Sequence, residues 1–325
     1  MTQAILCFGE ALIDFHAEGD DGHGYARHFT PYAGGAPANV AVAIARLGGH
    51  ARFAGMLAQD RFGDFLLDHL RHAGVGTDDV ARTDEANTAL AFVTLDAHGE
   101  RSFSFYRPPS ADLLFRATHF RAQTFDGLAV FHACSNSLTD PALAAATLVG
   151  MQRAQQAGAL VSFDLNLRAA LWPRDRDPRP EVWPALLLAD VVKLSAEEFT
   201  WLAVDGEEAA LERLWSGRAR LVLVTHGADT MRWFHPDAEG ELPSYRVKAV
   251  DSTAAGDAFV GGLLCQLAAQ NIRASDLDTL ISALPRLHAT LRYAAACGAL
   301  AVTRHGSFSA MPDDNEVRDF MEAQA

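Results

Sequence analysis

The chain has 325 residues, 49% of them hydrophobic, and its 27 basic and 41 acidic side chains give a net charge of −14. This length corresponds to about two average domains, or to one large α/β domain with an attachment. The shortage of positive charge argues against a protein that binds nucleic acid or an anionic membrane, because both depend on basic patches. The chain has two lysines, Lys193 and Lys248, and neither follows a glycine-rich run. This excludes a P-loop, so any phosphate must be bound in another way.

The cysteines, histidines and apolar runs exclude further classes. The four cysteines are far apart and form no Cys-x-x-Cys pair, which is typical of reduced residues in a cytoplasmic protein. The thirteen histidines form no motif typical of zinc sites. Charged residues interrupt the apolar stretches before they reach the ~18 residues of a membrane span, and we expect no secretory leader. We therefore expect a cytoplasmic protein that binds a small molecule.

Strand-like apolar runs alternate with helical patterns over most of the chain. Strands are predicted over residues 4–8, 51–58, 127–133, 159–164, 190–194, 220–225 and 246–250. Helices are predicted over residues 39–47, 62–72, 141–157, 197–203, 257–270, 276–301 and 314–322. The order predicts a mostly parallel sheet with helices on both faces, and the continuous apolar strands fit burial on both sides.

Two early segments depart from this alternation. Residues 88–96 and 100–106 have the pattern of strands, and residues 96–99 between them are typical of a hairpin turn. Residues 15–32 are polar and turn-rich, with no helical period. Together the segments, about 15–32 and 88–107, predict a small β-sheet beside the main one. It could be a lid over the strand ends, where open α/β sheets bind ligands, or a solvent-facing addition.

The first candidate motif is Gly34-Gly35-Ala36-Pro37-Ala38-Asn39. Paired glycines allow the backbone to approach a ligand closely, and the Asn39 amide can both donate to and accept from hydroxyl groups. The same residues could instead form an ordinary helix start, with a glycine turn and a proline in the first turn. From the residues alone, the helix start is the favoured interpretation.

The second candidate motif is Asp251-Ser252-Thr253-Ala254-Ala255-Gly256-Asp257. A turn of small residues before a helix exposes unpaired N–H groups, and the helix dipole adds positive potential, so the motif predicts an anion site that needs no lysine. Asp257 would stand beside the anion as an ionised proton acceptor. Alternatively, Asp257 is only the helix N-cap and Asp251 a loop residue.

At these two motifs the sequence resembles the PfkB (ribokinase-like) family of carbohydrate kinases. The first motif, continuing to Gly48, is similar to one family signature, and residues 251–259 are similar to the other. Some members have glycine where Ala254 stands. The resemblance implies a single PfkB-type kinase domain over residues 1–325. Its expected fold is a ribokinase-like three-layer α/β/α architecture, with a mostly parallel central sheet and a small β-sheet lid.

Three further stretches resemble the fructokinase branch: residues 9–14, residues 100–107 with 110–112, and residues 164–168 with 171–172. They imply transfer of the ATP γ-phosphoryl group to a primary sugar hydroxyl, with D-fructose converted to fructose 6-phosphate. A 2-keto-3-deoxygluconate kinase or a ribokinase-like kinase is the alternative, because the first of these shares parts of the stretches. A non-catalytic sugar sensor on the same scaffold is a further alternative.

The resemblance also assigns roles to residues. Asp257 would be the general base, and the backbone N–H groups of Ala254, Ala255 and Gly256 would bind the migrating charge. Asp14, expected at the end of the first strand, would accept hydrogen bonds from two sugar hydroxyls. The remaining sugar contacts would come from Gly34, Gly35, Asn39, Arg107 and Arg168. For each arginine the alternative is a surface ion pair.

On the nucleotide side, the segment from Lys193 to Glu198 resembles the family's Asn-x-x-Glu segment, with Ser195 in place of the asparagine. Glu198 would organise Mg²⁺ through water, although it could also be an ordinary glutamate in a first helical turn. Thr225 and Gly227 match a turn near the phosphates and ribose, and Ala295 replaces an asparagine beside the adenine. Asp251, Thr253 and Gly306 match a K⁺ site. The implied cofactors are therefore ATP, Mg²⁺ and K⁺, and the lid implies a homodimer.

Overall fold

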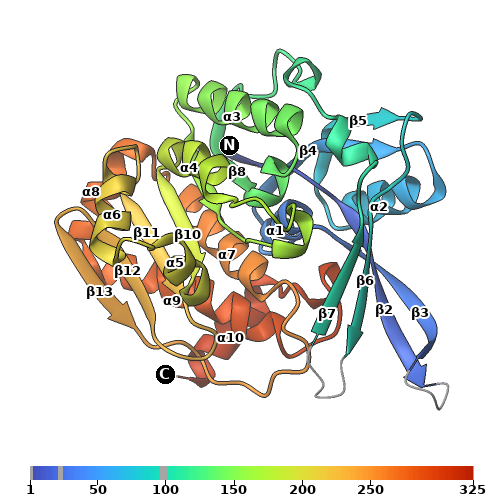
Figure 1. The fold of residues 1–325 in the computed structure, drawn as a ribbon. Coiled ribbons are helices and arrows are strands. Elements are labelled where there is room, and N and C mark those ends of the chain that lie inside the picture. The colour runs from blue at the N-terminus through green and yellow to red at the C-terminus, as the bar shows by residue number, and fades with distance from the viewer. Residues whose placement is uncertain (1–2, 21–24, 96–100, 325) are drawn as a thin grey trace.

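A nine-stranded sheet organises the part of the chain that the computed structural model describes, residues 3–20, 25–95 and 101–324. The strand order is β13-β12-β11-β10-β9-β8-β1-β4-β5 (Figure 1). The strands are β1 (Ala4–Phe8), β4 (His50–Ala58), β5 (Gly76–Thr83), β8 (Leu128–Cys134), β9 (Leu160–Asp164), β10 (Val191–Ser195), β11 (Leu221–Thr225), β12 (Met231–His235) and β13 (Ala238–Leu242). Neighbours from β5 to β11 are parallel, and β12 and β13 add an antiparallel edge.

Helices cover both faces of this sheet. On one face lie α1 (Ala36–Arg46), α2 (Arg61–His72), α7 (Ala255–Ala269), α8 (Leu277–Ser282), α9 (Leu284–Ala301) and α10 (Asp314–Ala323). On the other lie α3 (Pro141–Gln156), α4 (Arg179–Leu188), α5 (Ala196–Leu202) and α6 (Glu207–Trp215). Short 3-10 helices connect them: η1 (Ala111–Leu114), η2 (Ala117–His119), η3 (Ser135–Leu138), η4 (Ala169–Leu171), η5 (Ala274–Asp276) and η6 (Phe308–Ala310). The three-layer α/β/α prediction is confirmed.

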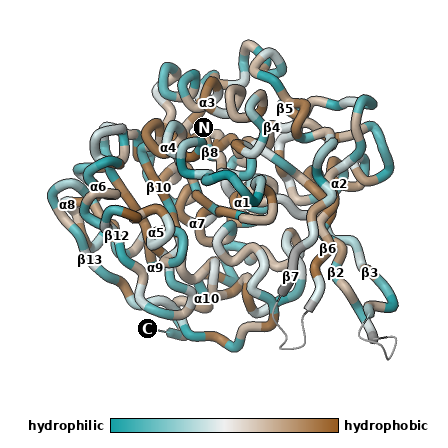
Figure 2. The backbone as a smooth tube through the Cα atoms, viewed as in Figure 1, coloured by the Kyte–Doolittle hydropathy of each residue, from teal (hydrophilic) through white to brown (hydrophobic). Residues whose placement is uncertain are grey.

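The central strand β1 shows why the sequence folds this way. All five of its residues are buried. Ile5 and Cys7 pack into the core on the α1 face, whereas Leu6 and Phe8 pack into the core on the α3 face. A strand that alternates sides yet is apolar throughout must be covered on both faces. Figure 2 shows the same contrast, with hydrophobic colour along the inner strands and hydrophilic colour on outer turns.

The small sheet is a separate four-stranded unit in the order β3-β2-β6-β7. Its strands are β2 (Leu12–Asp20), β3 (Ala26–Gly34), β6 (Leu90–Leu95) and β7 (Arg101–Tyr106). It projects from one end of the molecule, beside α2 (Figure 1). The sequence-based prediction of this sheet is confirmed, while the predicted hairpin turn over 96–99 lies outside the described residues.

Other predictions were wrong in detail. Residues 246–250 form no strand, because most of their side chains face solvent and no sheet edge buries them. The helix expected over 276–301 is broken at Ala283 into α8 and α9, and Pro285 stands in the first turn of α9. A proline has no N–H to continue the preceding helix. The sequence did not single out α4, α6, β5, β12 or β13. In the described part of the chain, no helix has both the length and the apolar content to cross a membrane.

Candidate active site

Two glycines at the start of α1 permit contacts that no other residue could make. A Cβ on Gly34 would lie 2.1 Å from Asp14 Oδ2, and one on Gly35 would lie 2.6 Å from the Glu10 carbonyl oxygen. Gly35 also has a φ of +105°, in the region that favours glycine. The N-cap residue is Gly35, which has no side chain to cap the helix. The glycines therefore bring the backbone against Asp14 and Glu10, which a plain helix start does not require.

The start of α7 faces the start of α1. The Asn39 amide donates to Asp257 Oδ2 at 2.8 Å, although the two residues are 218 positions apart. The residue before α7 is Ala254, which has a left-handed φ of 59° and makes no side-chain cap. Asp257 is the third residue of the helix, so the alternative that it is the N-cap is wrong. The first amides of α7 are thus left without a capping side chain, beside a buried carboxylate.

Asp14 lies opposite this pair, but on a different element than expected. It is in β2, the lid strand after β1, and not at the end of the first strand. Its side chain is buried and accepts a hydrogen bond from Ser307 Oγ at 3.4 Å. Burial raises the pKa of Asp14 to about 7, against the opposing effect of Ser307. The lid therefore contributes a carboxylate to the site, which favours the lid interpretation over a solvent-facing addition.

One exposed cation, Arg168, acts on the two acidic side chains Asp14 and Asp257. The Arg168 side chain, just before η4, is exposed, and its charge opposes the rise in pKa of both Asp14 and Asp257. Burial is the larger influence on each carboxyl and raises both pKa values. The predicted residues Asp14, Gly34, Asn39, Asp257 and Arg168 thus meet in one place, where a positive charge faces two buried acids.

A second cation lies beneath the α7 start. The Lys193 ammonium, from the middle of β10, donates at 3.2 Å to Oδ2 of Asp164 at the end of β9, and both side chains are buried. A Cβ on Gly256 would lie 3.0 Å from Lys193 Nζ. Burial alone would lower the Lys193 pKa, but nearby carboxylates, Asp164 first, outweigh it and raise the pKa. Lys193 is therefore a charged group directly against Gly256.

Ser195 and Glu198 close the start of α5. Ser195 Oγ accepts from the Glu198 N–H at 3.1 Å, and Glu198 Oε2 accepts from the Ser195 N–H at 2.7 Å. Glu198 Oε1 also accepts from the Leu167 N–H at 2.7 Å. The two residues form a capping box. Serine and asparagine are equally good N-cap residues, so Ser195 in place of asparagine keeps the helix capped. Nearby, Thr225 ends β11 and donates to the Leu194 carbonyl, and Gly227 follows with a φ of +55°.

The three residues expected to hold K⁺ are also together. Asp251 is 1% exposed, and its two oxygens accept from the N–H groups of Thr253 at 2.7 Å and Gly306 at 3.1 Å. The carboxylate thus joins the loop before α7 to the loop after α9. The described residues, these three included, contain no group of three or more histidine, cysteine or acidic side chains suited to hold a metal ion.

Comparison with known proteins decides the family. The family model described as "pfkB family carbohydrate kinase" matches residues 2–314. The chain belongs to the pfkB family of carbohydrate kinases. It is 40% identical over 325 residues to fructokinase-1 of Oryza sativa subsp. japonica, covering 99% of this chain and 98% of the relative. Like other pfkB carbohydrate kinases, it is a sugar phosphotransferase.

Solved structures give the same result. The crystal structure of a fructokinase with bound ATP from Xylella fastidiosa is 54% identical, with a TM-score of 0.95 and coverage of 100% of this chain and 99% of that one. A fructokinase from Vibrio cholerae O395, in a form with fructose, ADP and calcium ion bound, is 32% identical, with a TM-score of 0.86 and coverage of 98% and 99%. The ribokinase-like fold is therefore shared over the whole chain.

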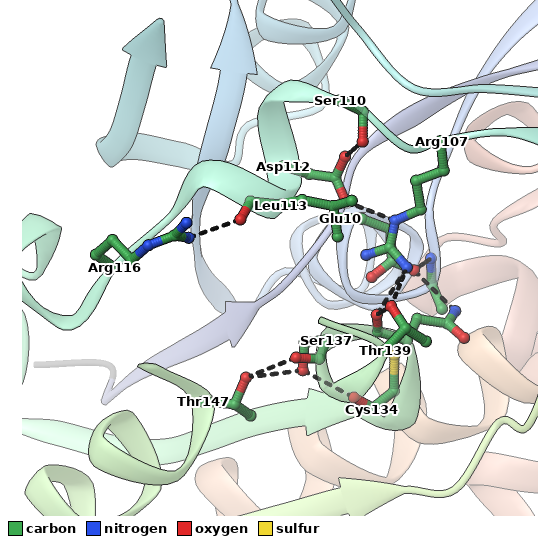
Figure 3. Close-up of polar contacts among 12 residues, drawn as sticks. Glu10, Arg107, Ser110, Asp112, Leu113, Arg116, Cys134, Ser137, Thr139 and Thr147 are labelled. Carbon is green, nitrogen blue, oxygen red and sulfur yellow. Dashed lines mark hydrogen bonds and ion pairs between the residues drawn. The ribbon is translucent and has the colours of Figure 1, made fainter. Parts of the chain in front are cut away.

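Arg107, which was predicted to contact the sugar, is bound to a different set of residues. Arg107 is 2% exposed, and its guanidinium donates from Nε to Asp112 at 2.7 Å and from Nη1 to the Asn136 carbonyl at 2.8 Å (Figure 3). The alternative of a surface ion pair is wrong, because the pair is buried. Its partners Asp112, Asn136 and Thr139 do not belong to the group around Asp14 and Asp257.

Sequence reasoning missed three residues of the site. Ser307, Asn136 and Asp164 are buried and bond to Asp14, Glu10 and Lys193 respectively. Each is a common polar residue outside the two glycine-rich motifs. The available signal was the position of Asp164 at the end of β9 and of Asn136 two residues after β8, because parallel strands end at one edge of the sheet.

Proposed function

We propose that the protein transfers the γ-phosphoryl group of ATP to the primary 6-hydroxyl of D-fructose. The observation that carries this proposal is the bond between Asn39 and Asp257 beside the uncapped start of α7. It brings a polar sugar-binding candidate, a carboxylate base and helix amides without a side-chain cap into one place. The similarity to fructokinases over the full length supports the choice of sugar.

Asp257 would accept the proton of the attacking hydroxyl. It is buried, and burial raises its pKa above the usual range of an aspartate, which makes it a stronger base than a free carboxylate. The Asn39 amide holds one carboxylate oxygen, so the other is directed at the substrate. Positioning of this kind is the main task in phosphoryl transfer, which needs little covalent chemistry from the protein.

The α7 start would stabilise the migrating charge. Its amides, in residues 254–257, are uncapped, and the dipole of a 15-residue helix adds positive potential. Lys193 lies against Gly256 from below. Together they would act on the phosphoryl oxygens as an oxyanion hole acts on an acyl group.

The sugar would be held by Asp14, Gly34, Gly35 and Asn39, with Arg168 above them. A neutral sugar suits this pocket better than a sugar acid. Arg107 is already paired with Asp112, which leaves the exposed Arg168 as the cation near the two acids. A carboxylate substrate such as 2-keto-3-deoxygluconate would add a third negative charge beside them.

The nucleotide would lie along the ends of β10 and β11, against Lys193, Ser195, Thr225 and Gly227. Glu198 already accepts two backbone hydrogen bonds, so a contact to Mg²⁺ through water fits it better than direct ligation. When bound, Mg²⁺ supplies charge neutralisation on the phosphates. The loops joined by Asp251, with Thr253 and Gly306, fit a K⁺ site, since a buried carboxylate there suits a nearby monovalent cation.

A sugar panel in an ADP-release assay tests the proposal. With ATP and Mg²⁺, we expect fructose to have the highest kcat/KM among fructose, 2-keto-3-deoxygluconate, ribose and glucose. A higher value for the sugar acid or for ribose would replace the substrate and keep the kinase. Binding of fructose without any ADP release would favour the sugar sensor. Chelation of Mg²⁺ and replacement of K⁺ by Na⁺ in the same assay test the two ions.

We also propose a homodimer formed through the lid. One face of the small sheet has an aromatic cluster in which Phe92 stacks on Phe15 at 5.2 Å and meets Phe29 and Tyr106 edge-on. The pairing of the strands puts these residues on the face opposite Asp14. Tyr106 is 68% exposed and Phe29 is 40% exposed. Exposed aromatic surface of this kind fits an association site.

The oligomeric state tests this part. Light scattering on the wild type is expected to give twice the chain mass, and a Phe29→Glu, Tyr106→Glu double variant is expected to give the mass of one chain. A wild-type monomer at working concentration would overturn the homodimer and leave the proposed activity untouched.

A further inference from the structure

A buried polar network surrounds Arg107 (Figure 3). Arg107 follows the last lid strand, β7, directly. Its Nη1 donates to the Asn136 carbonyl at 2.8 Å and to Thr139 Oγ1 at 2.9 Å, and its Nε donates to Asp112, which also accepts from Ser110 at 2.6 Å. The guanidinium thus binds the end of the lid to the turn after β8.

The network continues from Asn136 to the start of α1. The Asn136 side-chain amide donates to Glu10 Oε1 at 3.0 Å, and the same oxygen accepts from the Ala36 N–H at 3.2 Å. Ala36 is the first residue of α1, and one turn later Asn39 holds Asp257. Hydrogen bonds through Asn136 and Glu10, followed by the first turn of α1, therefore connect the end of the lid to the proposed base.

The charges of the network are balanced only in part. Glu10 and Asp112 are both buried carboxyls, and the Arg107 guanidinium is the cation among them. Burial raises the pKa of Glu10, and Arg107 opposes that rise. Glu10 Oε2, Asn136 Oδ1 and Arg107 Nη2 have no hydrogen-bond partner among the described residues. Such a network is sensitive to any change, because a lost partner leaves a buried charge uncompensated.

We propose that Arg107 and Glu10 are positioning residues that set the geometry of the sugar pocket by joining the lid strand β7 to the first turn of α1. This inference rests on the proposed function. Arg107 acts here through Asn136 and Glu10, and it does not itself touch the sugar. Its expected kinetic signature is a change in sugar affinity, because α1 and the lid carry the sugar residues Asn39 and Asp14.

Conservative variants test the proposal. Arg107→Lys retains the charge but cannot donate in two directions to Asp112 and Asn136, and Glu10→Gln retains the acceptor but removes the charge. Each is expected to raise the fructose KM about fivefold or more and to leave the ATP KM within about twofold, since small misplacements weaken a positioned site. The double variant is expected to raise the fructose KM no further than the stronger single variant, because both act through one path.

A matched control separates this effect from general loss of stability. Arg52 on β4 forms another largely buried pair, with Asp79 on β5, and it lies toward the strand end opposite the site. Arg52→Lys is expected to leave both KM values unchanged while its melting temperature falls as much as that of Arg107→Lys. Should Arg107→Lys fail to fold, Glu10→Gln decides alone, and an unchanged fructose KM in that variant overturns the proposal.

Deoxy analogues of fructose distinguish positioning from direct contact. If Arg107 acts through α1, the ratio of the KM of Arg107→Lys to that of the wild type is the same for every monodeoxy analogue. If Arg107 bonds one hydroxyl, the variant and the wild type become equal with the analogue that lacks that hydroxyl, and the proposal is overturned. Calorimetry of fructose binding without ATP gives the same comparison independently of turnover. A wild type that phosphorylates another sugar would overturn the proposed substrate, and the same variants would then be measured with that sugar.

Discussion

The starts of α5 and α7 are built in opposite ways, although Lys193 lies on the strand before α5 and against Gly256 of α7. At α5, Ser195 and Glu198 bond to each other's backbone N–H groups and close the helix end. At α7, the residue before the helix is Ala254, with no side-chain cap. The first helix end is completed by its own chain, whereas the second leaves its amides for a partner.

Under the proposed function, this difference would explain how a chain with two lysines handles phosphate. An uncapped helix start offers N–H groups and a positive dipole without a charged side chain, and small residues let the ligand approach. The cost is stability, because capping groups are missing and Ala254 is in a region that disfavours alanine. The α5 start contributes rigidity in exchange. The following substitutions test the different roles of the two helix starts.

Asp257→Asn should have the largest effect. The amide cannot accept the hydroxyl proton, so we expect kcat to fall about 10³-fold while fructose binding by calorimetry changes little. Asp313→Asn is the matched control, because Asp313 caps α10 and should matter only for stability. A kcat near that of the wild type in Asp257→Asn would exclude Asp257 as the base.

Gly256→Ala should come next. Its methyl group would lie 3.0 Å from Lys193 Nζ and would crowd the α7 start. We expect kcat to fall about 10- to 100-fold, because removal of part of an anion-stabilising site has effects of that size. The fructose dissociation constant should be unchanged. Steady-state kinetics with calorimetry measure both, and a pure increase in fructose KM would count against an anion hole at this turn.

The acids of the site should respond to pH. Burial raises the pKa of Asp14 to about 7 and raises that of Asp257 above its usual range, so both lose their ionised form at higher pH than a free aspartate. If ionised Asp14 binds the sugar, kcat/KM for fructose should fall about tenfold per unit as the pH drops below about 7. Asp14→Asn should remove the part of that fall due to Asp14, along with most of the affinity, and leave the part due to Asp257. A profile that is flat down to pH 5 would contradict this role.

Ser195→Ala should destabilise the closed helix end. Loss of the cap is expected to lower the free energy of unfolding by about 1 kcal/mol. Ser195→Asn should retain the stability, because asparagine is an equally good cap. Chemical denaturation measures both. Equal stability in all three proteins would show that the capping box contributes nothing.

Ala254→Gly should have the smallest effect. Glycine adopts the left-handed conformation without strain, but it also increases the entropy of the unfolded chain. We expect a gain in unfolding free energy below about 1 kcal/mol and an unchanged kcat. A marked loss of kcat would mean that the alanine methyl itself shapes the anion site.

Most of the fold could be predicted from the sequence, because buried parallel strands are apolar throughout and helices have clear ends. The edge strands β12 and β13 were missed, since β13 is mostly exposed and polar. The prediction of a strand over 246–250 was wrong, because a strand-like pattern forms a strand only where a neighbouring strand pairs with it.

The motifs of the candidate site could be predicted from the sequence, but the contacts between their residues could not. Asp14 and Asn39 were identified as candidates, but the bond from Asn39 to Asp257 and that from Ser307 to Asp14 join residues more than 200 positions apart. The contact of Arg107 with the sugar stays a prediction, and the surroundings of this residue illustrate the same limit. An arginine after a strand can reach either a ligand or a neighbouring carboxylate, and its burial with Asp112 became visible only in the folded chain.

The sequence by itself determined the layered α/β fold, the two glycine-rich motifs and the absence of a lysine-based phosphate loop. These follow from local chemistry: hydrophobic period, small residues and the residue types present. The tertiary structure alone decided that Asp257 is not a cap, that Asp14 comes from the lid, and that Arg107 serves Asp112 and Asn136. Each of these depends on which distant partner is within about 3 Å, and hydrogen bonds are decided at that distance.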